Sequence, residues 1–121
     1  MKLVIIRIKG QIGLKKEINE TLNRLRLRRK YVCVALENPT LVQLGMLKKV
    51  KDFVAYGEIS EETYKKLVEV RGRKDKDGKL KPFFRLHPPR GGIDSKKHFG
   101  VDKGVLGDNK DSINKLVERM L

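Results

Sequence analysis

The sequence is poor in residues that carry chemistry: it has one cysteine, no tryptophan and only two histidines. A single cysteine, Cys33, excludes an internal disulfide and indicates a reducing compartment, and its place in the apolar run Tyr31–Leu36 predicts a buried side chain. Cys33, His87 and His98 lack the paired spacing of metal ligands, so we expect no metal. No nucleophile elbow, nucleotide-binding P-loop motif or carboxylate cluster is present, so we expect no cofactor, no small-molecule substrate and no catalytic residues.

Long hydrophobic runs are also missing. No apolar stretch approaches the roughly 18–20 residues that a membrane-spanning helix needs. The N-terminal sequence MKLVIIRIKG has an apolar core too short for a secretory signal, and Arg7 and Lys9 interrupt it. We therefore expect a cytoplasmic protein without a membrane partner.

Acidic residues are scarce relative to basic ones. The chain has 29 Lys and Arg against 15 Asp and Glu, a formal net charge of +14. Residues 1–59 carry 13 basic and 5 acidic side chains, and residues 60–121 carry 16 and 10, so the excess is spread over the chain. Such a surplus repels itself in a lone enzyme but raises the affinity and association rate of a protein that binds a polyanion. The composition favours a nucleic-acid partner.

Residues 1–59 show the alternating pattern of a β-α-β-α-β unit. In order, we expect a strand at Leu3–Ile8, a helix at 15–27, a strand at Tyr31–Leu36, a helix at Leu41–Val50 and a strand at Phe53–Ile59. Both alternating sets of the first strand are mostly apolar, which indicates a central strand, and the two helices are expected on one face of the sheet. Strand order is not determined by these patterns.

Local sequence signals indicate where the later elements of this unit begin and end. Thr40 is a plausible N-cap for the second helix, in which Leu44, Leu47 and Val50 are expected to share the face toward the core. Gly57 is expected to stop the third strand. These features predict a compact core domain over residues 1–59.

Residues 60–121 read as an extension packed on this core, so the chain is a single domain overall. Ser60 is expected to cap a helix that ends near Arg71-Gly72. A basic loop rich in proline and glycine follows, and Gly104–Lys110 reads as a turn that leads to Asp108 or Asp111 as a helix cap. The closing helix within Asp108–Leu121 carries an apolar stripe formed by Ile113, Leu116, Val117 and Met120.

The most concentrated positive charge lies where the first helix ends. Five cations occur within seven residues: Arg24, Arg26, Arg28, Arg29 and Lys30. A helix C-terminus favours a cation by about 0.3–1 kcal/mol, which accounts for only one or two of them. The remainder predict a surface that faces a polyphosphate.

A second basic segment lies in the extension. Its candidate RNA-contacting residues are Arg85, His87, Arg90, Gly91 and Gly92, followed by Lys96, Lys97 and His98. Prolines restrict this backbone and the glycine pair permits close approach, which suits insertion between RNA helices. Phe83 and Phe84 would either stack on bases or anchor the loop to the domain. The alternative for this segment is a basic loop exposed to solvent. For the turn Gly10–Gly13, two roles stay open: it either binds phosphate through its backbone N–H groups or only connects the strand to the helix.

Four stretches together resemble a known family. They are KLVIIRIKGQIGLKKEINETLNRLRLRRK, NPTLVQLGMLKKVKDFVAYGEI, PFFRLHPPRGG and DSINKLVERML. They are similar to the universal large-ribosomal-subunit protein family numbered thirty in bacteria and seven in eukaryotes, in its archaeal type. The resemblance implies an α+β fold, with a small antiparallel three-stranded sheet whose first strand is central, packed on helices, plus a basic C-terminal extension that ends in a helix.

The resemblance also implies a role without enzymatic activity. It implies binding to large-subunit rRNA, close to the small rRNA of that subunit, with other ribosomal proteins as neighbours. The implied RNA contacts are Arg7, Lys9 and Gln11 around the glycine turn, Arg26, Arg28 and Arg29 at the helix end, and Arg85, His87, Arg90, Gly91 and Gly92 in the extension. Lys15 and Lys16 replace the basic residues and prolines of bacterial members and complete the expected surface.

Two other classes of function stay open at this point. A free-standing regulatory nucleic-acid binder would dimerise and bind duplex DNA. An RNA-processing enzyme would need a general base or a metal site, for which the sequence offers no candidate beyond the two histidines.

Overall fold

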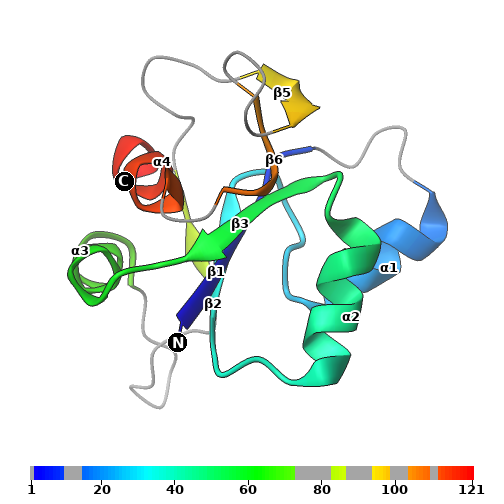
Figure 1. The fold of residues 1–121 in the computed structure, drawn as a ribbon, viewed down its shortest axis with the longest axis horizontal. Helices are drawn as coiled ribbons and strands as arrows, with labels where there is room; N and C mark the ends of the chain where they lie inside the picture. The colour runs from blue at the N-terminus through cyan, green and yellow to red at the C-terminus, as the bar shows by residue number, and fades with distance from the viewer. Residues whose placement is uncertain (1, 10–14, 73–82, 87–93, 99–103, 110–111) are drawn as a thin grey trace.

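The computed structural model describes residues 2–9, 15–72, 83–86, 94–98, 104–109 and 112–121. Within them, the elements in chain order are β1 (Lys2–Arg7), α1 (Lys16–Arg24), β2 (Val32–Glu37), α2 (Leu41–Val50), β3 (Val54–Glu58), α3 (Glu61–Arg71), β4 (Phe84–Arg85), β5 (Asp94–His98), β6 (Gly104–Asp108) and α4 (Ile113–Met120). The described strands form one mixed sheet in the order β4-β2-β1-β3-β6-β5 (Figure 1).

The first strand lies at the centre of this sheet, as its sequence predicts. β1 pairs antiparallel with β2 on one side and with β3 on the other. Val4, for example, is opposite Ala35 of β2 and Gly57 of β3. Gly57 therefore lies within β3, and the expectation that it stops this strand was wrong. A strand with apolar residues on both faces is stable only when both faces are covered, which selects the central position.

The extension contributes strands that the sequence did not predict. β4 pairs antiparallel with β2, and β6 pairs parallel with β3, where Ala55 is opposite Gly107. The sheet is therefore wider than the three strands expected, and Gly104–Asp108 is a strand instead of a turn. The N-cap of α4 is Ser112, without a side-chain hydrogen bond, instead of Asp108 or Asp111. These short strands were missed because each needs only one apolar residue, such as Phe84 or Leu106, to reach the core.

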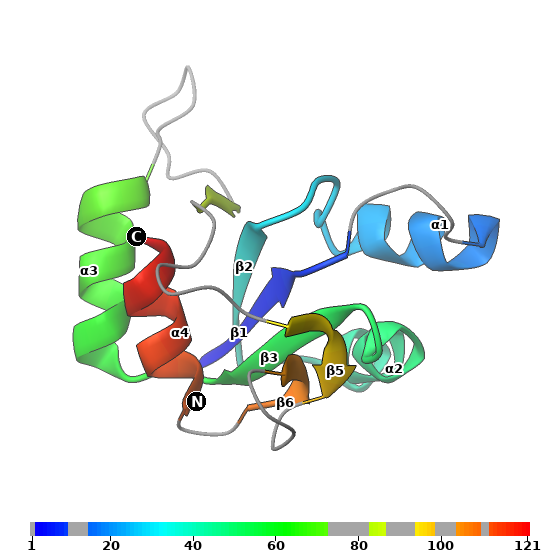
Figure 2. The same ribbon diagram turned by 90° about the horizontal axis from the view of Figure 1, so that it is seen from above.

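Helices cover both faces of the sheet. α1 and α2 lie on one face, and α3 and α4 lie on the other (Figures 1 and 2). On the α3/α4 side, the buried cluster contains Val4, Ile6, Ile8, Cys33, Ala55, Ile59, Leu67, Phe84, Leu106, Ile113, Leu116, Val117 and Met120. On the α1/α2 side, it contains Leu3, Ile5, Leu22, Leu25, Leu27, Val32, Val34, Leu47, Val50 and Val54. The predicted apolar stripe of the closing helix is thus confirmed, and so is the burial of Cys33.

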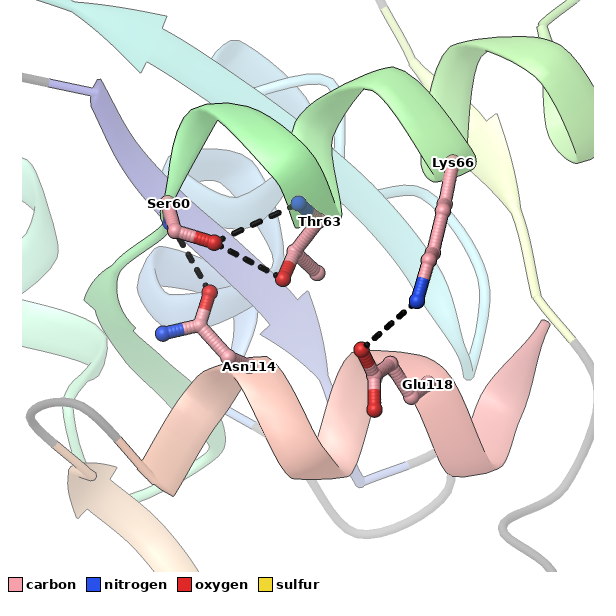
Figure 3. Close-up of polar contacts among 5 residues, drawn as sticks. All are labelled: Ser60, Thr63, Lys66, Asn114 and Glu118. Atoms are coloured by element: carbon pink, nitrogen blue, oxygen red, sulfur yellow. Dashed lines mark hydrogen bonds and ion pairs between the residues drawn. The ribbon is translucent and has the colours of Figure 1, made fainter.

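Polar contacts hold α3 and α4 together at the surface (Figure 3). The Ser60 hydroxyl accepts a hydrogen bond from the Thr63 backbone N–H, which confirms Ser60 as the N-cap of α3. The Ser60 backbone N–H donates to Asn114 Oδ1 of α4 at 2.8 Å. Lys66 Nζ lies 3.3 Å from Glu118 Oε1 one turn further along. These contacts align the two helices, while the apolar cluster beneath them supplies most of the stabilisation.

α2 has a complete capping box and an exposed apolar start. The Thr40 side chain accepts from the Gln43 backbone N–H, and the Gln43 side chain accepts from the Thr40 backbone N–H. Leu47 and Val50 are buried as predicted, but Leu44 is 41% exposed and does not share their environment.

Across the described ranges, no helix combines the length and the apolarity that spanning a membrane requires.

Candidate nucleic-acid interface

The basic junction between α1 and β2 is built on a helix C-cap. α1 ends at Arg24, three residues before the predicted end, because Arg26 adopts a left-handed backbone conformation with φ of 65°. The Arg26 N–H donates to the Asn23 carbonyl at 3.0 Å, and the Leu27 N–H donates to the Leu22 carbonyl at 2.8 Å. This pair of bonds defines a Schellman motif, in which a hydrophobic contact accompanies the cap. Leu22 and Leu27 provide that contact, since both lie in the same buried cluster.

The cap determines which side chains of the junction are buried and which are exposed. Leu25 and Leu27 are buried, whereas Arg26, Arg28 and Arg29 are exposed. A regular helix through residue 27 would have rotated Leu27 away from the face that carries Leu22. The left-handed turn at Arg26 returns the chain toward the core and leaves the guanidinium groups at the surface.

Arg7 does not belong to this surface, which corrects the expectation that it contacts RNA. Its side chain is fully buried, and its guanidinium donates to the Lys9 carbonyl at 2.9 Å, the Leu27 carbonyl at 2.7 Å and Asn19 Oδ1 at 3.2 Å. Burial lowers the pKa of Arg7 from its ordinary value, but an arginine stays charged at neutral pH. The three acceptors lie on β1's exit, α1 and the junction. Arg7 therefore fixes the position of the basic junction from inside.

Arg85 reaches the same region through a strand. In the β2–β4 pairing, Arg85 is opposite Val32 and Phe84 is opposite Cys33. The Leu86 N–H also donates to the Tyr31 carbonyl at 3.0 Å, which continues the attachment. Alternation along β4 sends Phe84 to the α3/α4 cluster and places Arg85 on the other face, beside the junction.

The junction and β4 enclose one pocket with a volume of about 260 Å³. Its lining residues are Arg26, Arg28, Arg29, Val32, Phe83 and Arg85. Four arginines thus line it from two segments that are more than fifty residues apart in the sequence. Every charged residue among the described lining residues is an arginine, so this wall of the pocket is cationic. Guanidinium forks match the geometry of phosphate oxygens, so the pocket suits a phosphate-bearing ligand.

Other predicted cations do not line this pocket but lie in the same part of the chain. Lys15 and Lys16 are exposed at the start of α1, and Arg24 is exposed at its end. Lys30 Nζ lies 5.0 Å from the ring centroid of Tyr31, a cation–π contact that orients it beside the junction. Lys9 lies 5.4 Å from the ring centroid of Phe53 in the same way.

The second basic segment is divided between the two edges of the sheet. Arg85 lies on the edge strand β4, whereas Lys96, Lys97 and His98 lie on β5, the edge strand at the opposite end. Lys96, Lys97 and His98 therefore do not lie on the strand that carries Arg85, and their place in a patch with the rest of this segment stays a prediction. Five further predicted contacts lie outside the described residues: Gln11, His87, Arg90, Gly91 and Gly92.

Sequence reasoning named Phe83 as a residue that would stack on bases or anchor the loop, but it missed Val32, the other apolar residue of the pocket wall. Phe83 is half-buried and packs against the α1/α2 cluster, so it anchors its segment to the domain. It also lines the pocket, so part of its ring remains available to a ligand. The alternation in Phe83-Phe84-Arg85 is the signal that would have placed Phe83 and Arg85 on one face. Among the described residues, no group of three or more His, Cys, Asp and Glu side chains is arranged to hold a metal ion.

Comparison with known proteins places this architecture in a family. Residues 3–54 match the family model described as Ribosomal protein L30p/L7e. The chain is 37% identical to the large ribosomal subunit protein uL30 of Methanosphaera stadtmanae, with 97% of this chain and 98% of that protein covered. It is 41% identical to uL30 of Desulfurococcus amylolyticus, with 97% and 96% covered, and 36% identical to uL30 of Archaeoglobus fulgidus, with 96% and 97% covered. Similarity over nearly the full length of both chains extends from the core into the extension, and the chain therefore belongs to the Ribosomal protein L30p/L7e family.

Proposed function

We propose that the protein is a structural constituent of the large ribosomal subunit that binds large-subunit rRNA through the arginine-lined pocket. The observation that carries this proposal is the convergence of Arg26, Arg28 and Arg29 from the α1–β2 junction with Arg85 from β4. The names of the archaeal relatives, each a large ribosomal subunit protein, support the ribosomal setting.

The fold supplies rigidity to this interface. The Schellman motif and the buried Arg7 guanidinium hold the junction in one conformation, and the β2–β4 pairing holds Arg85 against it. Cations that are already in position lose little conformational freedom on binding, so more of the phosphate attraction appears as affinity. Phosphate contacts fix the register of the protein on the RNA, while the fold itself performs no chemistry.

The wider interface includes further cations of the first half of the chain. Lys15, Lys16, Arg24 and Lys30 are exposed and Lys9 is half-buried, and we include all five as RNA contacts outside the pocket. The residues that lie outside the described ranges, Gln11, His87, Arg90, Gly91 and Gly92, and the β5 residues Lys96, Lys97 and His98 remain candidates for additional contacts. Arg7 is excluded because its guanidinium is engaged in the interior.

This role has consequences for partners and location. The protein would reside with ribosomes in the cytoplasm, close to the small rRNA of the large subunit and to neighbouring ribosomal proteins. It would act without catalysis. Co-sedimentation with large subunits in moderate salt tests the assignment directly, and a sedimentation profile outside ribosomes would contradict it.

The salt dependence of RNA binding tests the interface. The double variant Arg28→Ala/Arg29→Ala is compared with wild-type protein on a large-subunit rRNA fragment over a range of salt concentrations. Each phosphate contact contributes about −0.7 to −0.9 to the slope of log K against log salt, so the loss of two contacts should reduce the magnitude of this slope by about 1.5. The double variant Lys65→Ala/Lys115→Ala removes the same charge from exposed positions on α3 and α4 and should leave the slope unchanged. An unchanged slope for the arginine variant would remove those residues from the interface.

A further inference from the structure

The pocket has two chemically distinct kinds of wall. Arg26, Arg28, Arg29 and Arg85 provide cationic groups, whereas Phe83 and Val32 provide an apolar surface. Val32 is opposite Arg85 in the β2–β4 register, and Phe83 packs against the α1/α2 cluster, so the apolar wall is part of the core. A site that binds only phosphate oxygens needs hydrogen-bond donors and positive charge but no apolar wall. The apolar wall indicates a ligand that also presents a hydrophobic face.

A nucleotide has both properties, because it joins a planar base to an anionic phosphate. In an RNA helix the bases are stacked inside and only the backbone is offered to a protein, but in loops and bulges an unpaired base is free to stack on an aromatic side chain. We propose that the pocket holds one unstacked nucleotide of the rRNA, with its base against Phe83 and Val32 and its phosphates on the arginines. This inference rests on the proposed function and deepens it, since it names the RNA feature that the site selects.

The dimensions and the position of the pocket support a single nucleotide. A volume of about 260 Å³ is just below the roughly 300–1,000 Å³ of usual small-molecule sites, so it favours one nucleotide over a stacked run of bases. Arg26 lies at the left-handed turn of the junction and Arg85 on an edge strand, so cations flank the apolar wall from two elements. Such flanking donors suit the phosphates on both sides of an everted nucleotide. A carboxylate from a neighbouring protein would satisfy the arginines but would leave Phe83 without a partner of matching shape.

The test uses the full-length protein and two RNA hairpins that differ in one group. One hairpin carries a single bulged adenosine, and the other carries an abasic residue at the same place, so both have the same number of phosphates. Stacking of a base on an aromatic side chain corresponds to about a fivefold or larger gain in affinity. Wild-type protein should therefore bind the adenosine hairpin at least about fivefold more tightly, and the bulged base protons should shift upfield from the Phe83 ring current.

Matched variants identify the side chain responsible. Phe83→Leu keeps an apolar group but removes the ring, so it should abolish the preference for adenosine, which is read as the ratio of the affinities for the two hairpins. Phe53→Leu makes the same change in a half-buried phenylalanine of the same cluster that does not line the pocket, and it should retain the preference. If Phe83→Leu folds poorly, the upfield shift of the bulged base protons in the wild-type complex still reports stacking on an aromatic ring, and its absence would overturn the proposal.

The outcomes separate this inference from the proposed function. Equal binding of the two hairpins by wild-type protein, with a normal salt slope, would overturn the nucleotide pocket and leave the phosphate interface intact. A preference for adenosine that survives Phe83→Leu would also overturn it, because the base would then lie elsewhere. Loss of the salt slope and of the dependence on Arg28 and Arg29 would instead overturn the proposed function.

Discussion

The Nη1 atom of Arg7 donates a 2.7 Å hydrogen bond to the carbonyl oxygen of Leu27. Leu27 is the residue at which the chain returns to the core after the left-handed turn of the Schellman motif. The bond therefore joins the end of the central strand to the segment that presents the exposed arginines. A charged side chain in the core acts here as a structural brace for the cationic surface above it.

Replacement of Arg7 should lower the free energy of unfolding of the protein, because its guanidinium joins β1 to the basic junction. Arg7→Met removes three hydrogen bonds from buried or partly buried acceptors, which should lower the free energy of unfolding by about 3 kcal/mol. Arg7→Lys keeps the charge but loses the fork that reaches three oxygens at once, so it should restore little of that stability. Urea unfolding measures both. Full recovery of stability in Arg7→Lys would show that charge, and not geometry, is what the site requires.

Arg26 combines a strained backbone with a functional side chain, and two substitutions separate these roles. A left-handed conformation costs a non-glycine residue about 1–2 kcal/mol, so Arg26→Gly should be about 1 kcal/mol more stable than Arg26→Ala. Both variants lose the guanidinium and should lose RNA affinity equally. Thermal unfolding and filter binding on the same rRNA fragment provide the two readouts. Equal stability of the two variants would contradict the assigned backbone strain.

Cys33 should make the protein less stable in alkali. Burial raises the pKa of its thiol well above the ordinary value, so the folded protein keeps the proton while the unfolded chain releases it above about pH 8.5. Since the native state then binds more protons, stability falls as pH rises, by about 1.4 kcal/mol at pH 9.5 for this one group. Cys33→Ala lacks this term, so the stability gap between the two proteins should change by that amount between pH 7 and pH 9.5. A constant gap would mean that the thiol is accessible in the native state.

The capping box of α2 gives a local prediction. Thr40→Ala removes the acceptor for the Gln43 backbone N–H and should cost about 1 kcal/mol in the free energy of unfolding. Thr40→Ser retains the hydroxyl and should be nearly neutral. RNA affinity serves as the control readout, because Thr40 does not line the pocket. A loss of affinity in the well-folded alanine variant would place this end of α2 in the interface.

The docking of α4 should depend on its apolar stripe far more than on its surface charges. Val117 is fully buried, so Val117→Ala should lower the free energy of unfolding by about 1–3 kcal/mol. Glu118→Gln breaks only the exposed ion pair with Lys66 and should change it by less than about 0.5 kcal/mol. Chemical denaturation of Val117→Ala and Glu118→Gln measures the free energy of unfolding of each variant for this comparison. The reverse order of effects would mean that the helix is held by its polar contacts.

Several features of the protein were determined by sequence patterns of short range. The alternating apolar residues of β1, the capping signals at Thr40 and Ser60 and the apolar stripe of α4 each depend on neighbours within one element, and each was predicted correctly. The surplus of cations and the family resemblance predict a polyanionic partner from the sequence alone. Local propensity and periodicity suffice for such features because the deciding contacts lie within a few residues.

Tertiary structure decided which arginines serve the surface and which serve the core. Arg7, Arg26 and Arg85 are equally basic in sequence, yet one is buried as a brace, one caps a helix and one reaches the pocket from an added edge strand. Short strands such as β4 form their hydrogen bonds with a strand about fifty residues away in the sequence, so no local sequence pattern predicts them. Charge can be counted along a chain, but its position relative to the core depends on these long-range pairings.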